Sequence, residues 1–141
     1  MKRNWLVVLA LIAVSVVASL RGMSRTKEEG ERDVVRLKQA MPALDGKSLT
    51  ATLVEVTYTP GAGSEPHSHP CPVIGYVIEG TIESQVAGQP LGRYEAGQTF
   101  YEEPNGVHAI SRNPSKDKPA RLLAYLLCDK PGPLTTPPNG K

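Results

Sequence analysis

The feature that most constrains the fold is a series of short apolar and β-branched stretches, each closed by a turn signal. Glycine and proline clusters such as Pro60-Gly61, Glu95-Ala96-Gly97 and Asn113-Pro114 bound these stretches. We expect strands over residues 50–59, 73–79, 81–86, 91–94, 98–102, 107–112 and 120–128. Many short strands with turns this close together are typical of sandwiches and barrels. The sequence therefore predicts an all-β fold, an antiparallel double-sheet β-barrel.

The first twenty residues have a different composition. Lys2 and Arg3 give a basic start, residues 5–20 are apolar apart from Ser15 and Ser19, and residues 16–18 are small. This is the pattern of an export signal peptide over residues 1–20. The apolar run is slightly short for a membrane span, so cleavage is favoured, and an uncleaved N-terminal anchor stays open. In both cases we expect the rest of the chain outside the cytoplasm, in the periplasm or the extracellular space.

A chain of 141 residues has room for one domain beyond this segment. Residues 21–32 are mostly polar and charged, which predicts a solvated linker. A barrel over residues 33–130 follows, and we expect it to begin with a short edge strand at residues 34–37. Residues 131–141 contain four prolines and two glycines, so we expect an irregular tail.

Charge and composition exclude some partners. The chain has 16 basic and 14 acidic residues, and cleavage after Ala18 would remove Lys2 and Arg3, leaving 14 of each sign. Because no dense basic block remains, nucleic acid is not an expected partner. No Ser-His-Asp arrangement or phosphate-binding glycine loop is visible. A barrel this small buries a limited fraction of its surface, so we expect a homodimer.

All three histidines lie in two short pieces beside turn signals. His67 and His69 are two residues apart, so in an extended strand both imidazoles leave by the same face. His108 can complete the set from a neighbouring strand. Three converging imidazoles suit a divalent transition metal ion and leave coordination positions open for water or substrate. We therefore expect a metal site at His67, His69 and His108, and we favour it over three structural histidines.

The spacing of these residues resembles the two sequence signatures of the cupin superfamily, in the form found in small single-domain members. The first signature runs from Gly61 through His67-Ser68-His69 and position 73 to Gly80. The second includes Gly97, Pro104-Asn105-Gly106-Val107-His108 and Asn113, with small departures in the gaps around the last two. The resemblance covers about residues 50–128.

The resemblance implies a cupin or jelly-roll barrel with His67, His69 and His108 as metal ligands on its inner face. The family's usual fourth ligand is a glutamate, and Val73 occupies its position here. Because a negative ligand is missing, we expect a departure from the family's usual iron or manganese chemistry. A site of three histidines, or a site without metal, is favoured more than in the average cupin. The identity of the ion stays open among zinc, iron, manganese, nickel and copper.

Three acidic residues lie near the histidines in the sequence. Glu65 is two residues before His67, but Pro66 between them can break the alternation, so a solvated rim residue is favoured over a ligand. One of Glu102 and Glu103 must face inward in a regular strand, where it can act as a general base or orient a histidine. A pair of solvated turn charges is the favoured interpretation of these two.

Cys71 and Cys128 are the only cysteines. In an exported protein an even pair can form a disulfide, but nothing in the spacing requires one. We favour free thiols, with a disulfide second and metal ligation by Cys71 third.

Two classes of function fit these features. The first is a metal-dependent oxygenase or isomerase acting on a small organic molecule, with the ion's open positions binding substrate or dioxygen. The second is a non-catalytic module that binds or senses a small ligand at the same barrel mouth. A fold does not fix a function, so the resemblance leaves both open.

Overall fold

The computed structural model describes residues 34–45 and 49–138, where all regular secondary structure is β. All strands of the described residues lie in the unit Val35–Lys141. The strands are β1 (Thr50–Tyr58), β2 (His67–Ser68), β3 (Val73–Glu79), β4 (Thr81–Val86), β5 (Gly92–Glu95), β6 (Thr99–Glu102), β7 (Val107–Arg112) and β8 (Ala120–Cys128). The expected export segment and polar linker, residues 1–32, lie outside the described residues. Within the described ranges, no helix has the length and apolar character needed to cross a membrane.

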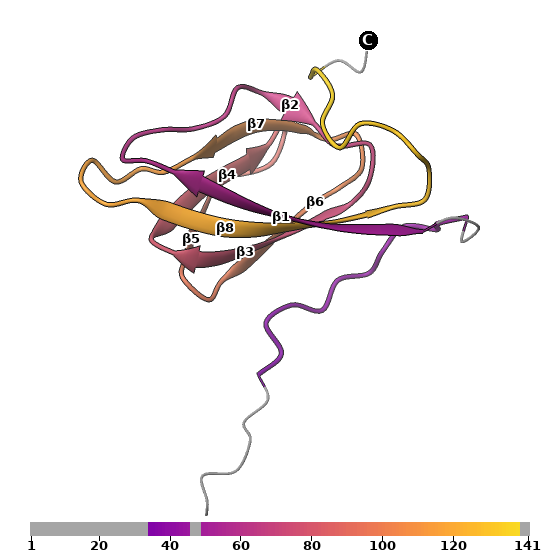
Figure 1. Ribbon diagram of the computed structural model, residues 1–141, viewed down its shortest axis with the longest axis horizontal. Helices are drawn as coiled ribbons and strands as arrows, with labels where there is room; N and C mark the ends of the chain where they lie inside the picture. The colour runs from indigo at the N-terminus through magenta and orange to yellow at the C-terminus, as the bar shows by residue number, and fades with distance from the viewer. Residues whose placement is uncertain (1–33, 46–48, 139–141) are drawn as a thin grey trace, which may run out of the picture. The chain divides into compact units, whose positions relative to one another are not determined.

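The strands form two four-stranded antiparallel sheets, in the orders β1-β8-β3-β6 and β2-β7-β4-β5. Figure 1 shows β1, β8 and β3 side by side in one layer and β2, β7 and β4 in the other. Apart from the hairpin of β4 and β5, each strand lies in the sheet opposite to that of the strand before it. This confirms the expected antiparallel double-sheet β-barrel.

Alternation along the strands builds the core between the sheets. In β3, Val73 and Val77 are buried while Tyr76 between them faces solvent, as the two-residue period of a strand requires. Two groups of buried residues result, with members from both sheets in the first: Val77, Ile82, Phe100, Ala120 and Leu122; and Cys71, Val73, Leu126 and Cys128. Apart from Phe100 and the two cysteines, both groups are aliphatic, in agreement with the small number of aromatic residues.

Turn residues fix where the strands end. Gly80, between β3 and β4, has φ of 72°, a backbone conformation that glycine adopts without strain. A Cβ there would also lie 2.6 Å from the carbonyl oxygen of Pro119. The buried Asn113 shapes the turn after β7, because its amide donates to the Lys118 carbonyl at 2.7 Å and its oxygen accepts from the Ser115 N–H at 3.0 Å. Both signature residues thus have structural roles.

Two expectations are wrong. Residues 34–37 form no strand, and residues 34–45 contain no regular secondary structure. The segment contacts the barrel through isolated hydrogen bonds, such as the one that the Thr99 hydroxyl donates to the Arg36 carbonyl at 3.1 Å. Cys71 and Cys128 are also not free thiols, because they form a disulfide across a sequence separation of 57 residues. This bond excludes Cys71 as a metal ligand and joins the loop after β2 to the end of β8.

Replacing Gly75 by alanine is expected to destabilise the barrel. A Cβ at this buried position in β3 would overlap the ring of Phe100, its direct partner in β6. Overpacking of this kind costs about 1–3 kcal/mol, because the ring must leave its rotamer or the strands must separate. Urea unfolding measures the effect, with Gly132→Ala as control because no atom lies within 4 Å of a Cβ there. Equal stability of the two variants would contradict this packing.

Candidate metal centre

Strand pairing brings the three histidines together. His67 in β2 and His108 in β7 are direct partners across the antiparallel pair, and their ring centroids lie 5.2 Å apart. His69 follows β2 by one residue and lies on the same face as His67, with ring centroids 4.8 Å apart. One nitrogen from each histidine lies within 4.8 Å of the others. The structure therefore assembles the three residues that the sequence singled out.

Backbone carbonyls fix the tautomers of two of these rings. Nδ1 of His67 lies 2.8 Å from the carbonyl oxygen of Glu65, and Nδ1 of His69 lies 2.7 Å from that of Leu134. A carbonyl oxygen only accepts, so each Nδ1 carries a proton, and in the neutral ring each Nε2 presents a lone pair. These two Nε2 atoms are 3.1 Å apart. Facing lone pairs repel unless a cation lies between them, and a carbonyl on the second nitrogen is the usual support of a metal-binding histidine.

His108 is the most buried of the three, with 4% of its side chain exposed. Its Nε2 lies 2.9 Å from the Ser84 hydroxyl. Its Nδ1 lies 3.0 Å from Oε2 of Glu102 but is buried without a directed hydrogen bond to any described group. The distance is short enough for a strong electrostatic interaction between the ring and the carboxylate, but the N–H direction at Nδ1 does not point at Oε2, so no hydrogen bond forms. An ion beside this line would satisfy both atoms.

The protonation state of His67 favours metal binding. Burial lowers its pKa below the ordinary value of 6.5, against the raising effect of the bond to the Glu65 carbonyl, and the nearby His69 and His108 lower it further. The neutral imidazole is the form that binds a metal ion. At neutral pH the site therefore needs no proton release from His67.

The histidines open into a cavity of about 670 Å³ inside the barrel. This volume is in the range of sites for small organic molecules. Its wall is mainly apolar and includes Val54, Val56, Phe100, Leu122 and Leu126. A small group of hydroxyls also lines it, in which the Tyr58 oxygen lies 3.0 Å from Ser111 Oγ and 3.3 Å from Ser64 Oγ. The cavity thus offers an apolar wall with polar groups at two places.

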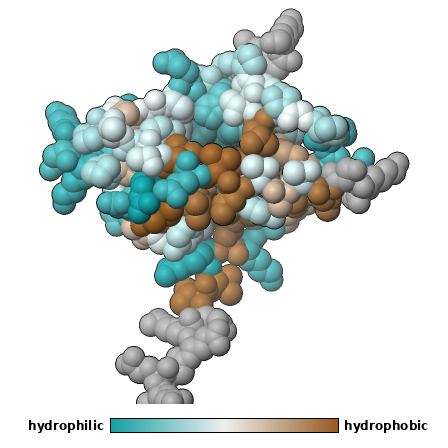
Figure 2. Space-filling model, in the orientation of Figure 1, coloured by the Kyte–Doolittle hydropathy of each residue, from teal (hydrophilic) through white to brown (hydrophobic). Residues whose placement is uncertain are grey.

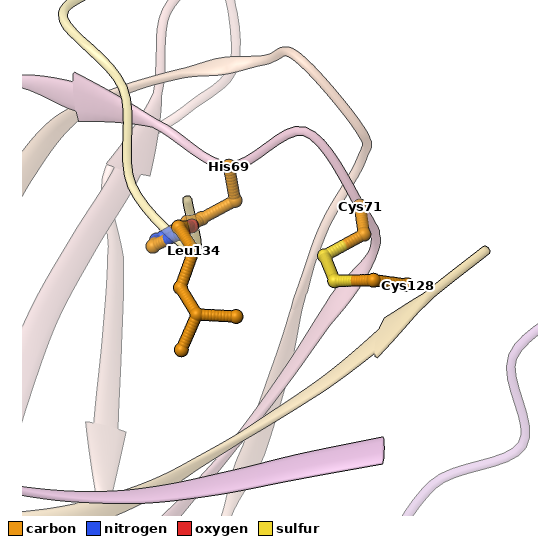
Figure 3. Close-up of a disulfide and its surroundings, with 4 residues drawn as sticks. All are labelled: His69, Cys71, Cys128 and Leu134. Carbon is orange, nitrogen blue, oxygen red and sulfur yellow. A yellow bond between two sulfur atoms is a disulfide. The ribbon is translucent and has the colours of Figure 1, made fainter. Parts of the chain in front are cut away.

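The C-terminal segment, residues 129–138, closes one side of this cavity. Thr136 forms a pair of backbone hydrogen bonds with Ser68, at 2.9 and 3.0 Å, and residues 134–137 line the cavity. Figure 3 shows Leu134 beside His69, and the disulfide of Cys71 and Cys128 close by. Residues 131–138 form no strand and take part in one isolated bridge, between Thr136 and Ser68. The sequence gives no signal for the contact of this segment with His69, because a bond to a backbone carbonyl does not depend on the side chain that carries it.

Removing this segment is expected to weaken metal binding. A chain that ends at Lys130 loses the Leu134 carbonyl that orients His69, and loss of such an outer partner costs roughly 10–100-fold in metal affinity. A chain that ends at Pro138 keeps these contacts and serves as control. Titration of both chains with Zn²⁺ measures the difference. Equal affinities would show that the segment does not support His69.

The three glutamates near the site have different positions. Glu65 is an exposed residue at the rim, as expected, and Glu103 is exposed as well. Glu102, in contrast, is buried with 5% exposed, so the interpretation as a solvated turn charge is wrong for this residue. It stands two positions after the buried Phe100 in β6, and this alternation is the signal that identifies it as inward-facing.

Comparison with known proteins identifies the family. The family model described as "Cupin domain" matches residues 54–126, which is about half of the chain and includes all three histidines. The chain belongs to the cupin family. No curated protein matches the sequence at a significant level.

Solved structures of similar fold come from several bacteria. A cupin-like protein from Thermotoga maritima is 28% identical, with 54% of this chain and 56% of that chain covered and a TM-score of 0.49. The DMSP lyase DddQ from Ruegeria pomeroyi is 24% identical, with 67% and 46% covered and a TM-score of 0.52. The polyketide cyclase RemF from Streptomyces resistomycificus is 21% identical, with 66% and 63% covered and a TM-score of 0.51. The chain thus spans less than two thirds of each, and the last two similarities concern the fold alone.

Proposed function

We propose that this chain is an exported cupin that binds one divalent transition metal ion through His67, His69 and His108 and acts on a small organic molecule. The observation that carries the proposal is the pair of Nε2 lone pairs of His67 and His69, which two backbone carbonyls hold 3.1 Å apart. Between two neutral rings such an arrangement is unfavourable without a cation and favourable with one.

The proposed reaction class is that of a metal-dependent oxygenase or isomerase. When bound, a divalent ion supplies a Lewis acid for a substrate oxygen or a redox centre for dioxygen. The chain's own residues would bind the substrate's carbon skeleton against the apolar wall and its polar groups at the Tyr58 and Ser111 hydroxyls. The names of the lyase and the cyclase among the similar folds refer to reactions of small molecules, which supports a small organic substrate.

A second candidate is a non-catalytic module that binds or senses a small ligand. The largely apolar cavity wall favours it, because such a wall can hold a ligand without offering groups for proton transfer. The two candidates differ in one result. The enzyme converts its ligand when the metal is loaded, whereas the module binds it saturably without product.

The experiment is a screen of the metal-reconstituted protein against phenols, thiols and dicarbonyls, with oxygen consumption and product formation as readouts. Turnover by the loaded wild type that is absent in His108→Ala would support the enzyme. Saturable binding of a compound without product would support the module. Absence of metal binding by the wild type would contradict the metal site and the enzyme.

We further propose that residues 1–20 direct export. The disulfide of Cys71 and Cys128 supports this, since disulfides persist in oxidising compartments outside the cytoplasm. Mass spectrometry of the protein from its native cell tests it. A mature N-terminus near Ser19 indicates a cleaved signal, and an intact Met1 with membrane association indicates an anchor. Full-length protein found only in the soluble cytoplasm would contradict export.

A homodimer through the outer face of the β1-β8-β3-β6 sheet is our proposal for the assembly. Leu53, Tyr125, Ile74 and Tyr101 are successive cross-strand partners on this face, and Leu53 is 61% exposed. Figure 2 shows apolar side chains gathered over these strands. Exposed apolar patches of this kind mark interaction sites. Sedimentation of the wild type and Leu53→Glu is the test: a dimer that becomes a monomer supports the interface, and a monomeric wild type excludes it.

A further inference from the structure

The position of Glu102 on β6 suggests a role at the histidine site. Val73 on β3 and Glu102 on β6 are direct partners in the antiparallel pair, and both side chains face the barrel interior. Glu102 thus carries its carboxylate into the barrel from the strand beside the one that holds Val73. Its Oε2 lies 3.0 Å from Nδ1 of His108 and 3.9 Å from Nε2 of His69.

The burial of this carboxylate requires a positive partner. Only 5% of Glu102 is exposed, and an ionised carboxylate that is buried without a counter-charge is strongly unfavourable. Among the described residues, the basic side chains within 4.0 Å of its oxygens are those of His69 and His108. Neither histidine donates a hydrogen bond to the Glu102 carboxylate. Nδ1 of His108 has no hydrogen-bond partner, and Nδ1 of His69 donates to the Leu134 carbonyl. A cation among these three groups would compensate the charge.

Two separations fit a shared ion directly, whereas the histidine nitrogens lie up to 4.8 Å apart and would have to move closer together to share it. Two ligand atoms that each lie about 2.0–2.2 Å from one ion are separated by roughly 2.8–3.6 Å in a tetrahedral or octahedral shell. The separation of 3.1 Å between the Nε2 atoms of His67 and His69 lies in this range, as does that of 3.0 Å between Nδ1 of His108 and Oε2 of Glu102. The separation of 3.9 Å between Nε2 of His69 and the same oxygen lies outside this range.

We infer that Glu102 is the fourth ligand of the metal ion and supplies, from β6, the carboxylate that Val73 does not supply from β3. The inference rests on the proposed function and names the ligand set of that site. Three imidazoles and one carboxylate bind ions such as Mn²⁺ and Fe²⁺ better than three imidazoles alone, because carboxylates suit harder cations. Val73 therefore does not exclude iron or manganese as the bound ion.

The test compares Mn²⁺ and Zn²⁺ binding by the wild type and three variants in full-length, untagged protein. Glu102→Gln removes the negative charge at nearly constant shape, and Glu103→Gln removes the charge of an exposed neighbour as control. In the double variant Val73→Glu/Glu102→Val, the carboxylate moves to the partner strand. We expect Glu102→Gln to lose at least about 100-fold in Mn²⁺ affinity and less in Zn²⁺ affinity. Glu103→Gln should bind like the wild type, and the double variant should regain Mn²⁺ affinity.

The outcomes separate this inference from the proposed function. A wild type that binds neither ion contradicts the proposed function itself. Unchanged Mn²⁺ affinity in Glu102→Gln contradicts only the fourth ligand. Equal losses for both ions without recovery in the double variant also contradict it, and assign Glu102 to the orientation of His108. Should Glu102→Gln fail to fold, the Mn²⁺-loaded wild-type structure decides, with Glu102 Oε2 expected about 2.0–2.2 Å from the ion and further away if the inference is wrong.

Discussion

Replacing His67 or His108 by alanine is expected to remove most of the bound metal. Each substitution deletes a nitrogen from a shell of three imidazoles whose donor atoms lie within 4.8 Å of one another. The remaining groups form an incomplete shell, so the loss of affinity should exceed the roughly 10–100-fold that removal of an outer partner costs. Elemental analysis of protein purified without a histidine tag measures the metal content directly.

Glu65→Gln is the matched control for the His67 variant. It removes a charge at the rim but keeps the backbone carbonyl of residue 65, which accepts the hydrogen bond from Nδ1 of His67. Its metal content should therefore equal that of the wild type. The assignment of the site is wrong if His67→Ala and His108→Ala both retain as much metal as the wild type.

Loss of the disulfide is expected to have the largest effect on stability. Cys71 and Cys128 close a loop across 57 residues, and the loop-closure entropy of the unfolded chain corresponds to up to about 4 kcal/mol. The bond joins two buried residues that pack with Val73 and Leu126. For a domain of this size, such a loss lowers Tm by roughly 10–20 °C. Thermal unfolding of the wild type with and without dithiothreitol, in the absence of metal, measures it.

The double variant Cys71→Ala/Cys128→Ala is the control for the effect of the reductant. Its Tm should be low in both conditions and should not change when dithiothreitol is added. A wild type whose Tm is the same under oxidising and reducing conditions, while mass spectrometry confirms reduction, would contradict a stabilising role of the bond.

Local patterns were sufficient to predict most strands. The bounds of β3, β4, β7 and β8 agree with the expected ranges, because glycine, proline or asparagine stands near their ends and β-branched or aliphatic residues fill them. The segment at residues 34–37 has apolar residues as well, yet it forms no strand. A strand needs backbone hydrogen bonds to a neighbouring strand, and no local pattern reports whether these form.

The three histidines were predictable because two of them are two residues apart and the third follows a turn. The disulfide was not, since it joins residues that only the sheet register brings together. Glu102 shows the same limit. Alternation from Phe100 indicates that it faces inward, but its place opposite Val73 depends on the pairing of β3 with β6. The sequence reports which residues share a face of a strand, and the pairing of strands determines which of them meet.

The central claim, that an ion binds at the histidines between β2 and β7, is tested most directly by anomalous diffraction. Crystals of untagged protein grown with Mn²⁺ or Zn²⁺ would be measured on both sides of the metal absorption edge. One strong peak is expected within bonding distance, about 2.0–2.2 Å, of a nitrogen of each of His67, His69 and His108. Crystals that contain the ion elsewhere, or that show no peak among the three rings at saturating metal, would contradict the claim.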